Sequence, residues 1–168
     1  MPISSDDDFD GAPLLRGEFV LDEGHGPLVR ATLHATAHGI FEAFLNGRPV
    51  SDDVLSPGWS SYEWRLRYRS YDVTSLIQPT SVLGMALGNG WFRGRLGWSG
   101  HGAFYGDELA ALAQLEIEFS DGYLQTIVTD QSWTAGPSAT RRSRWRTSRR
   151  AITRSWSKDR PVPLRGRR

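Results

Sequence analysis

The sequence of 168 residues predicts an all-β protein, a single antiparallel β-sandwich or jelly roll. Three observations support this fold class. Short segments alternate apolar and polar residues, which is the period of a half-buried strand. The dipeptides Asn46-Gly47 and Asp121-Gly122 separate such segments, and both favour tight hairpin turns. No window of a dozen residues shows the 3.6-residue period of an amphipathic helix. Short strands joined by turns are typical of sandwiches.

The expected strands follow in order along the chain. Residues 1–13, with the acidic run SSDDDFD, predict a linker, and order is expected from Leu14 to Gly136. Within this range the alternating or buried segments are LVRATLHAT, GIFEAFLN, YEWRLRYRSYDV, SVLGMALG, ALAQLEIEF and YLQTIVTD. In the third of them, Arg65, Arg67 and Arg69 are expected on one face, with Leu66 and Tyr68 on the other. The sequence thus predicts two hairpins and one domain, residues 14–137.

Charge divides the chain into two unlike parts. Residues 1–140 hold 8 basic and 18 acidic residues, whereas residues 141–168 hold 12 basic and one acidic residue. The arginine-rich segment 138–168 has few aliphatic residues and no alternation, so we expect a disordered tail. Arginine and tryptophan in such tails can bind the phosphate backbones of nucleic acids without sequence specificity. This is a minor interpretation of the tail, and no specific nucleic acid is expected as a partner.

Composition excludes several classes of protein. The sequence has no cysteine, which rules out disulfides, iron–sulfur clusters, cysteine zinc sites and thiol nucleophiles. No run approaches the roughly 18 apolar residues of a membrane helix. The acidic N-terminus also lacks the pattern of a secretory signal, so no membrane association and a cytoplasmic location are expected.

Motif searches favour no catalytic chemistry. Gly88, Gly90 and Gly94 are spaced G-x-G-x-x-x-G, one residue off the dinucleotide fingerprint, and no helix-like segment is expected after them. The patterns G-x-S-x-G and H-E-x-x-H do not occur, and the four histidines are scattered. The pairs Asp52-Asp53 and Asp107-Glu108 could be drawn as glycosidase carboxylates, but adjacent carboxylates on loops are usually solvated.

A sugar-binding surface is the remaining functional interpretation from the residues. A pyranose has an apolar C–H face and a ring of hydroxyls, so its site combines an aromatic plate with planar polar groups. Possible plates are Trp59, Tyr62, Trp91, Trp98 and Tyr105, and possible polar partners are Asp52, Asp53, Asn89, Arg93 and Asp107. Packing of these aromatic rings in the core or over its open end is the alternative.

Several linked motifs resemble a known family. The series F-L-N-G, D-D-x-L-x-P-G-W-x-x-Y, Y-D-V-T, L-G-N-G-W-x-R-G and Y-G-D runs in order between about Leu14 and Trp133. It resembles the N-terminal module of bacterial α-L-rhamnosidases, which are inverting glycoside hydrolases. This module is a β-sandwich of the galactose-binding-like type. The resemblance implies a non-catalytic module of a larger enzyme, whose acid and base carboxylates belong to a separate (α/α)₆ barrel. It leaves open whether this chain is itself an enzyme.

The resemblance also implies a ligand and candidate site residues. In some members a related module binds terminal L-rhamnose beside calcium, and Asp52, Asp53, Asn89 and Trp91 match the motifs. With the flanking Trp59 and Arg93 they form the predicted carbohydrate site, with no catalytic residue and no firm metal ligand. Before the Y-G-D motif this chain has Ala103-Phe104 where the family commonly has asparagine, and Ala103 offers a hard cation only its carbonyl. Calcium therefore remains an optional cofactor.

The resemblance leads to two hypotheses about function. The first is recognition of L-rhamnosides, and the alternative is a structural role in which the tryptophan-rich end packs against the catalytic domain of a parent enzyme. The motif resemblance ends after QSWTAGP, where arginine becomes frequent. A frameshift or a misplaced gene end between about Pro137 and Arg141 is the hypothesis for this change.

Overall fold

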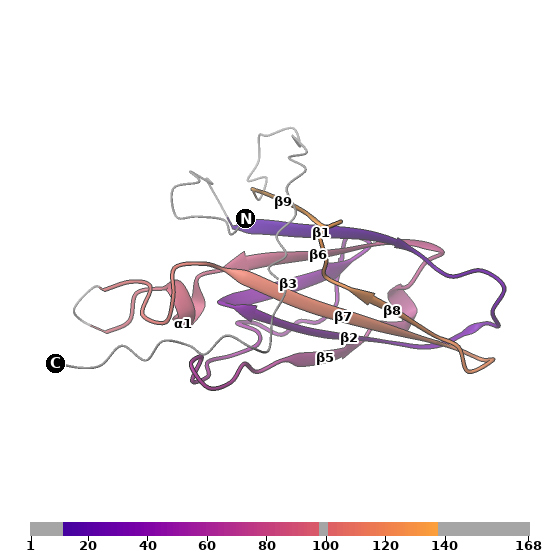
Figure 1. Cartoon of the computed structure of the whole chain (residues 1–168), viewed down its shortest axis with the longest axis horizontal. Coiled ribbons are helices and arrows are strands. Elements are labelled where there is room, and N and C mark those ends of the chain that lie inside the picture. The colour runs from indigo at the N-terminus through magenta and orange to yellow at the C-terminus, as the bar shows by residue number, and fades with distance from the viewer. Residues whose placement is uncertain (1–11, 98–100, 138–168) are drawn as a thin grey trace.

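The computed structural model describes residues 12–97 and 101–137, which form two antiparallel β-sheets facing each other (Figure 1). The strands are β1 (Pro13–Val20), β2 (Leu28–His38), β3 (Ile40–Leu45), β4 (Arg48–Pro49), β5 (Arg69–Asp72), β6 (Thr80–Gly88), β7 (Ala110–Phe119), β8 (Leu124–Val128) and β9 (Thr134–Pro137). One turn of 3₁₀ helix, η1 (Thr74–Leu76), and one turn of α-helix, α1 (Gly90–Arg93), complete the elements. The predicted antiparallel β-sandwich is therefore confirmed.

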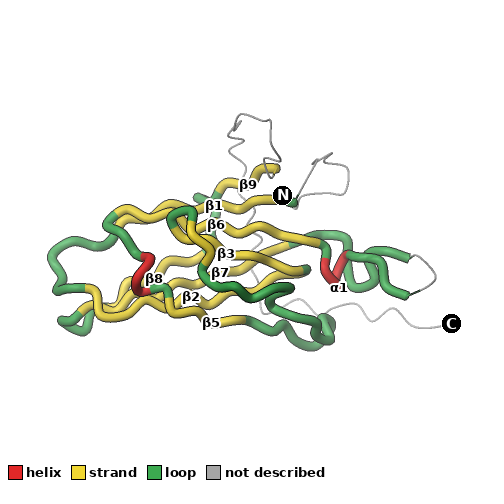
Figure 2. The backbone as a smooth tube through the Cα atoms, turned by 180° about the vertical axis from the view of Figure 1, so that it is seen from behind, coloured by secondary structure: helices red, strands yellow, loops and turns green. Residues whose placement is uncertain are grey.

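The two sheets have different strand orders. The first is β4-β3-β6-β1-β9 and the second is β5-β2-β7-β8. Seen from behind, β5 lies along the lower border of the molecule and α1 lies at one end (Figure 2). The long segment between β4 and β5 connects an edge strand of the first sheet to an edge strand of the second.

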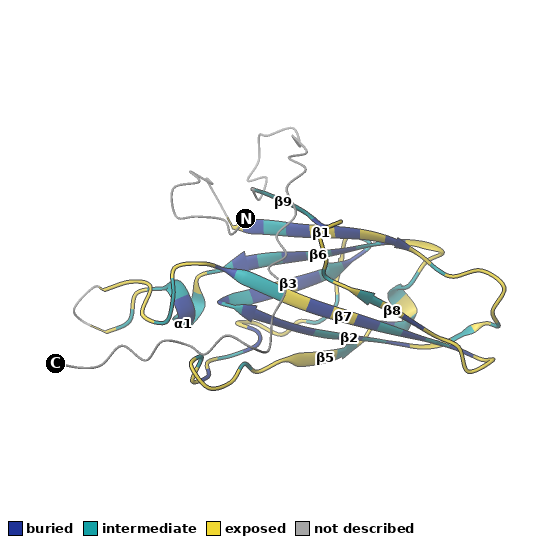
Figure 3. Ribbon diagram, viewed as in Figure 1, coloured by how far each residue is buried: buried dark blue, intermediate teal, exposed yellow. Residues whose placement is uncertain are grey.

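The core lies between the sheets and follows the predicted alternation. On β7, the expected inward residues Leu115, Ile117 and Phe119 are all buried, and on β2 Leu33 is buried in the same layer. Burial alternates along the central strands (Figure 3). Fully burying one such side chain stabilises the fold by about 1.5–3 kcal/mol, so the alternation itself decides which face of each strand turns inward.

Strand β9 closes one edge of the first sheet. It pairs with β1 in the register Leu14 to Gly136 and Arg16 to Thr134. Just before it, Trp133 is buried and lies against Gly17, where a Cβ atom would overlap the indole ring. A glycine at this position therefore lets the tryptophan ring pack closely on the middle of β1.

The first hairpin has the predicted turn, and a side chain of this turn also forms hydrogen bonds to neighbouring elements. Asn46 and Gly47 have φ values of 52° and 78°, the left-handed conformations that the Asn-Gly pair tolerates. The Asn46 side chain also accepts a hydrogen bond from the Val82 backbone N–H (2.8 Å) and donates to the Leu76 carbonyl (2.9 Å) and the Ser81 hydroxyl (3.1 Å). One side chain thus joins the turn to η1 and to β6.

The structure differs from the sequence prediction in two details. No helix follows Gly94 in the described residues, as predicted, but Gly90–Arg93 within the glycine-rich stretch forms one helical turn, α1. A single turn needs no helical period, because it is held here by burial of Phe92 rather than by an amphipathic face. The extended segment expected at residues 62–73 is a strand only over Arg69–Asp72, since residues 62–64 form a turn in which the Trp64 backbone N–H donates to the Ser61 carbonyl.

The predicted acidic linker at residues 1–13 falls largely outside the described residues, and the predicted tail at 138–168 falls wholly outside them. The described part of the chain contains no helix that is long and apolar enough to span a membrane.

Candidate functional site

A cavity of about 270 Å³ lies beside the outer edge of β3. Two backbone hydrogen bonds attach the following segment to this strand: Val50 N–H donates to the Ala43 carbonyl, and Phe41 N–H donates to the Ser56 carbonyl. The chain between Val50 and Ser56 loops outward between these two attachments. The cavity therefore lies between β3 and the loop that follows it, at an edge where only the short strand β4 pairs with β3.

The cavity combines aromatic rings with carboxylates. Its lining residues are Phe41, Glu42, Ala43, Phe44, Pro49, Val50, Ser51, Asp52, Asp53, Val54, Ser56 and Tyr71. Tyr71 comes from β5 in the other sheet, and its hydroxyl donates to the Ser56 hydroxyl oxygen at 3.2 Å. The cavity thus has walls from both sheets and presents acceptors beside apolar surfaces.

Asp52 and Asp53, two of the predicted site residues, both line this cavity and are exposed. The backbone N–H of Asp53 donates to the Ser51 hydroxyl oxygen at 2.9 Å, which holds the loop at that residue. Both carboxylates therefore keep their oxygens available to a ligand in the cavity.

The other four predicted site residues lie elsewhere. Trp59 is exposed in the segment before β5, Asn89 is exposed immediately before α1, and Trp91 and Arg93 are half-buried within α1. None of them lines the cavity. The residues predicted as one site are thus divided between the cavity and the end of the sandwich that carries α1.

Aromatic packing organises the end that carries α1. The Phe92 ring stacks on the His38 ring with centroids 4.4 Å apart, and the Tyr62 ring meets Phe92 edge-on at 5.1 Å. A Cβ atom at Gly106 would lie 2.6 Å from Cζ of Phe92, so only glycine fits there without displacement. The glycine-rich end is therefore closely packed around Phe92.

Two further rings extend this packing to the surface. Tyr105 lies 4.9 Å from Tyr62 between ring centroids, and its hydroxyl oxygen accepts a hydrogen bond from the indole N–H of Trp59 at 3.2 Å. Trp59 nevertheless exposes 55% of its surface. This tryptophan is held by one edge while its ring remains accessible.

Burial shifts two titratable groups at this end. Loss of hydration lowers the pKa of His38, which favours the neutral imidazole against Phe92. Burial also raises the pKa of Tyr62, with a contribution from Tyr105. The Tyr62 hydroxyl is buried without a hydrogen-bond partner among the described residues. Both shifts favour neutral forms, as expected for a packing cluster.

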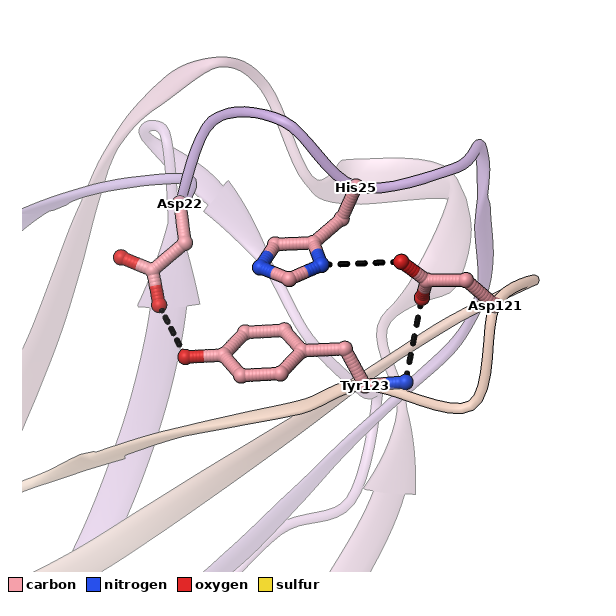
Figure 4. Close-up of polar contacts among 4 residues, drawn as sticks. All are labelled: Asp22, His25, Asp121 and Tyr123. Carbon is pink, nitrogen blue, oxygen red and sulfur yellow. Dashed lines mark hydrogen bonds and ion pairs between the residues drawn. The ribbon is translucent and has the colours of Figure 1, made fainter.

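A separate polar cluster ties two loops together at the opposite end (Figure 4). The His25 and Tyr123 rings stack with centroids 3.7 Å apart, and His25 Nδ1 lies 2.9 Å from a carboxylate oxygen of Asp121. The Tyr123 hydroxyl donates to the Asp22 carboxylate at 2.8 Å. The hydrogen bond with His25 contributes most to a lowered pKa of Asp121, and that with Asp22 to a raised pKa of Tyr123.

Side chains alone do not complete a calcium site in the described residues. No group of three or more His, Cys, Asp or Glu side chains in residues 12–97 and 101–137 is arranged to hold a metal ion. Calcium takes six to eight oxygen ligands, of which Asp52 and Asp53 would supply only the carboxylate part. Carbonyl groups, water or a bound sugar would have to supply the rest.

Apart from Asp52 and Asp53, sequence reasoning missed the residues of the cavity wall, among them Glu42, Phe44 and Tyr71. Tyr71 belongs to the Y-D-V-T motif, so the motif itself marked its position. Its proximity to Asp52 depends on the packing of the two sheets, which no local pattern shows.

The fold and the cavity define a β-sandwich module with a small, partly acidic opening at a sheet edge. The family model of the α-L-rhamnosidase N-terminal domain matches residues 26–159, so the chain belongs to this family. The match continues past residue 137, where the described residues and the motif resemblance both end.

Known relatives support the same assignment. The α-L-rhamnosidase of Streptomyces avermitilis is 44% identical over 122 residues, which are 72% of this chain and 12% of that protein. An α-L-rhamnosidase of Formosa agariphila is 38% identical over 111 residues, 64% of this chain and 12% of that protein. The chain therefore spans about 12% of the length of these relatives.

Solved structures show the same fold. The S. avermitilis α-L-rhamnosidase complexed with L-rhamnose aligns with a TM-score of 0.71 and 42% identity, covering 75% of this chain and 12% of that one. Native α-L-rhamnosidase from Aspergillus terreus aligns with a TM-score of 0.73 and 37% identity, covering 80% of this chain and 15% of that one.

Proposed function

We propose that this chain is a non-catalytic module that recognises L-rhamnosides for a larger α-L-rhamnosidase. The observation that carries the proposal is the cavity beside β3, where Phe44 and Tyr71 lie with Asp52 and Asp53. Its volume of about 270 Å³ is near the lower end of the ligand pockets of proteins, which begin at roughly 300 Å³. A cavity of this size suits a single sugar unit.

The lining matches the two surfaces of a deoxyhexose. The rings of Phe44 and Tyr71 can face its C–H bonds and methyl group, and the carboxylates of Asp52 and Asp53 can accept hydrogen bonds from its hydroxyls. Hydrogen bonds to charged acceptors contribute about 1.5–3 kcal/mol each. Hydrolysis is assigned to the remainder of the parent enzyme, and this chain alone is expected to bind without cleaving.

One relative supports this function. A solved α-L-rhamnosidase structure to which this chain is 42% identical is a complex with L-rhamnose. Calcium is an optional part of the proposal, because Asp52 and Asp53 would need additional oxygen ligands.

Titration calorimetry of the full chain with L-rhamnose, with and without calcium, tests the proposal. Asp53→Asn should weaken binding by roughly 10- to 100-fold, because one charge-assisted hydrogen bond is lost. Glu23→Gln is the matched control, since Glu23 is also exposed but lies in the loop after β1, outside the cavity lining. A folded protein that binds no rhamnose under either condition would refute the proposal, as would equal weakening by both substitutions.

A second function, packing against the parent's catalytic domain, is favoured by a different observation. Large apolar side chains are exposed near the end that carries α1, including Trp59 and Phe104 at 55% and 66%. Such clusters typically mark protein interaction sites. The test is binding of the full chain to the S. avermitilis relative from which the matching segment has been deleted. Loss of binding on Phe104→Ser would support docking, and no binding by the unaltered chain would reject it.

A further inference from the structure

Three exposed arginines, Arg65, Arg67 and Arg69, lie in and just before β5, and none of them forms an ion pair within residues 12–97 and 101–137. Within the described part of the chain, the only arginines in ion pairs are Arg16 and Arg30. Glu63 is close in sequence but does not pair with any of the three. Their guanidinium groups are thus unoccupied by carboxylates of the described chain.

Strand register places Arg69 on the same side of β5 as Tyr71, which lines the cavity. Arg69 lies opposite Ala35 of β2 and Tyr71 lies opposite Leu33, and directly opposed residues share a face of the sheet. The Thr36 hydroxyl donates to the Arg67 carbonyl at 2.6 Å, so the chain before β5 continues beside β2. Arg69 and Tyr71, two residues apart on β5, therefore lie on the same side about 7 Å apart, and Arg67 precedes them in the segment beside β2.

The direction of this row is also determined by the register. His38 ends β2 and stacks on Phe92 of α1, and Arg67 lies nearer to that end of β2 than Tyr71 does. Tyr71 lines the cavity, so the arginines extend from the cavity rim toward the end that carries α1. We call residues Arg65, Arg67 and Arg69 the arginine strip.

Charge separates the strip from the cavity. Glu42, Asp52 and Asp53 line the cavity, so an anionic sugar is repelled there while a neutral sugar is not. The planar guanidinium fork of arginine, in contrast, matches a carboxylate with two parallel hydrogen bonds. We propose that the arginine strip binds a carboxylate-bearing sugar, a uronic acid unit, attached to the neutral sugar in the cavity.

The order of the two sugars rests on the proposed function, because that function places the rhamnose in the cavity. The preference of the strip for a uronate does not depend on it. The alternative role of the arginines is to protect the free edge of β5, since charged residues on edge strands prevent pairing between molecules. That role requires no ligand.

The experiment compares two double variants of the full chain by titration calorimetry with trigalacturonate and with neutral galactotriose. One variant is Arg67→Gln with Arg69→Gln. The control is Arg16→Gln with Arg48→Gln, which removes the same two charges from exposed positions on β1 and β4. The unaltered chain and both variants carry the same basic residues at 141–168, so nonspecific attraction of this segment for polyanions cancels in the comparison.

The expected result is at least tenfold weaker trigalacturonate binding by the Arg67/Arg69 variant than by the control. Galactotriose should bind no better than background to either protein, and thermal melting should show that both are folded. Equal trigalacturonate affinities would overturn the proposal, and self-association of the Arg67/Arg69 variant without loss of affinity would assign the strip to edge protection. L-rhamnose titration of the unaltered chain reports separately on the proposed function, since its failure leaves the trigalacturonate comparison interpretable.

Discussion

Replacing Asn46 by alanine tests the turn after β3. The side chain accepts from the Val82 N–H and donates to the Leu76 carbonyl and the Ser81 hydroxyl, and φ at this residue is 52°. Alanine removes all three hydrogen bonds and adopts the left-handed conformation only with strain. The change therefore acts on two physical terms at once.

The magnitude follows from those terms. Each net hydrogen bond contributes about 0.5–1.5 kcal/mol, and an L-residue in the left-handed region costs roughly 1–2 kcal/mol. Ser81 is fully buried, but its hydroxyl keeps its contacts with the Gln78 backbone, so that bond is the least costly to lose. The expected destabilisation is about 3–5 kcal/mol, a large share of the 5–15 kcal/mol typical of a folded protein.

Urea unfolding of the full chain, followed by tryptophan fluorescence, measures this loss. Asn46→Gly is the matched control, because glycine accepts the positive φ and lacks only the three hydrogen bonds. We expect the glycine variant to be more stable than the alanine variant by about 1 kcal/mol. An alanine variant within about 1 kcal/mol of the unaltered protein would refute the assignment of Asn46 as the link between the hairpin, η1 and β6.

Three further predictions concern other parts of the sandwich. Gly106→Ala should destabilise the fold by about 1–3 kcal/mol in urea unfolding, since its Cβ would lie 2.6 Å from Phe92, and Phe92→Leu in the same background should recover part of the loss. Ala103→Gly should raise the melting temperature, because Ala103 has a φ of 54° that glycine adopts without strain; an unchanged or lower temperature would contradict this. The Asp121 pKa is lowered below 3.8, chiefly by its hydrogen bond with His25, so Asp121 stabilises the fold above that pH and loses this contribution as the pH falls through its folded-state pKa. On acidification, the urea midpoint of the unaltered protein should therefore fall more than that of Asp121→Asn. Midpoints that fall equally with pH in the two proteins would argue against the His25 contact.

The candidate site was predictable only in part. The linked motifs indicated Asp52 and Asp53, and the structure places both in a cavity. Trp59 and Trp91 belong to the same series of motifs but lie outside that cavity, since Trp59 follows the cavity loop and Trp91 lies in α1 at the end of the sandwich. Motif order therefore marks which residues matter without showing which of them share a site.

The sequence by itself determined the hairpin turns and strands β2, β3, β6, β7 and β8, but not β1, β4 or β9. Alternation of apolar and polar residues is a local property, and burial of Leu115 and Ile117 follows directly from it. Only the tertiary structure decided that Tyr71 reaches the wall containing Asp52, and that Phe92 packs on His38. Those contacts join residues that are distant in sequence, and they depend on how the two sheets and their loops pack, which no local periodicity encodes.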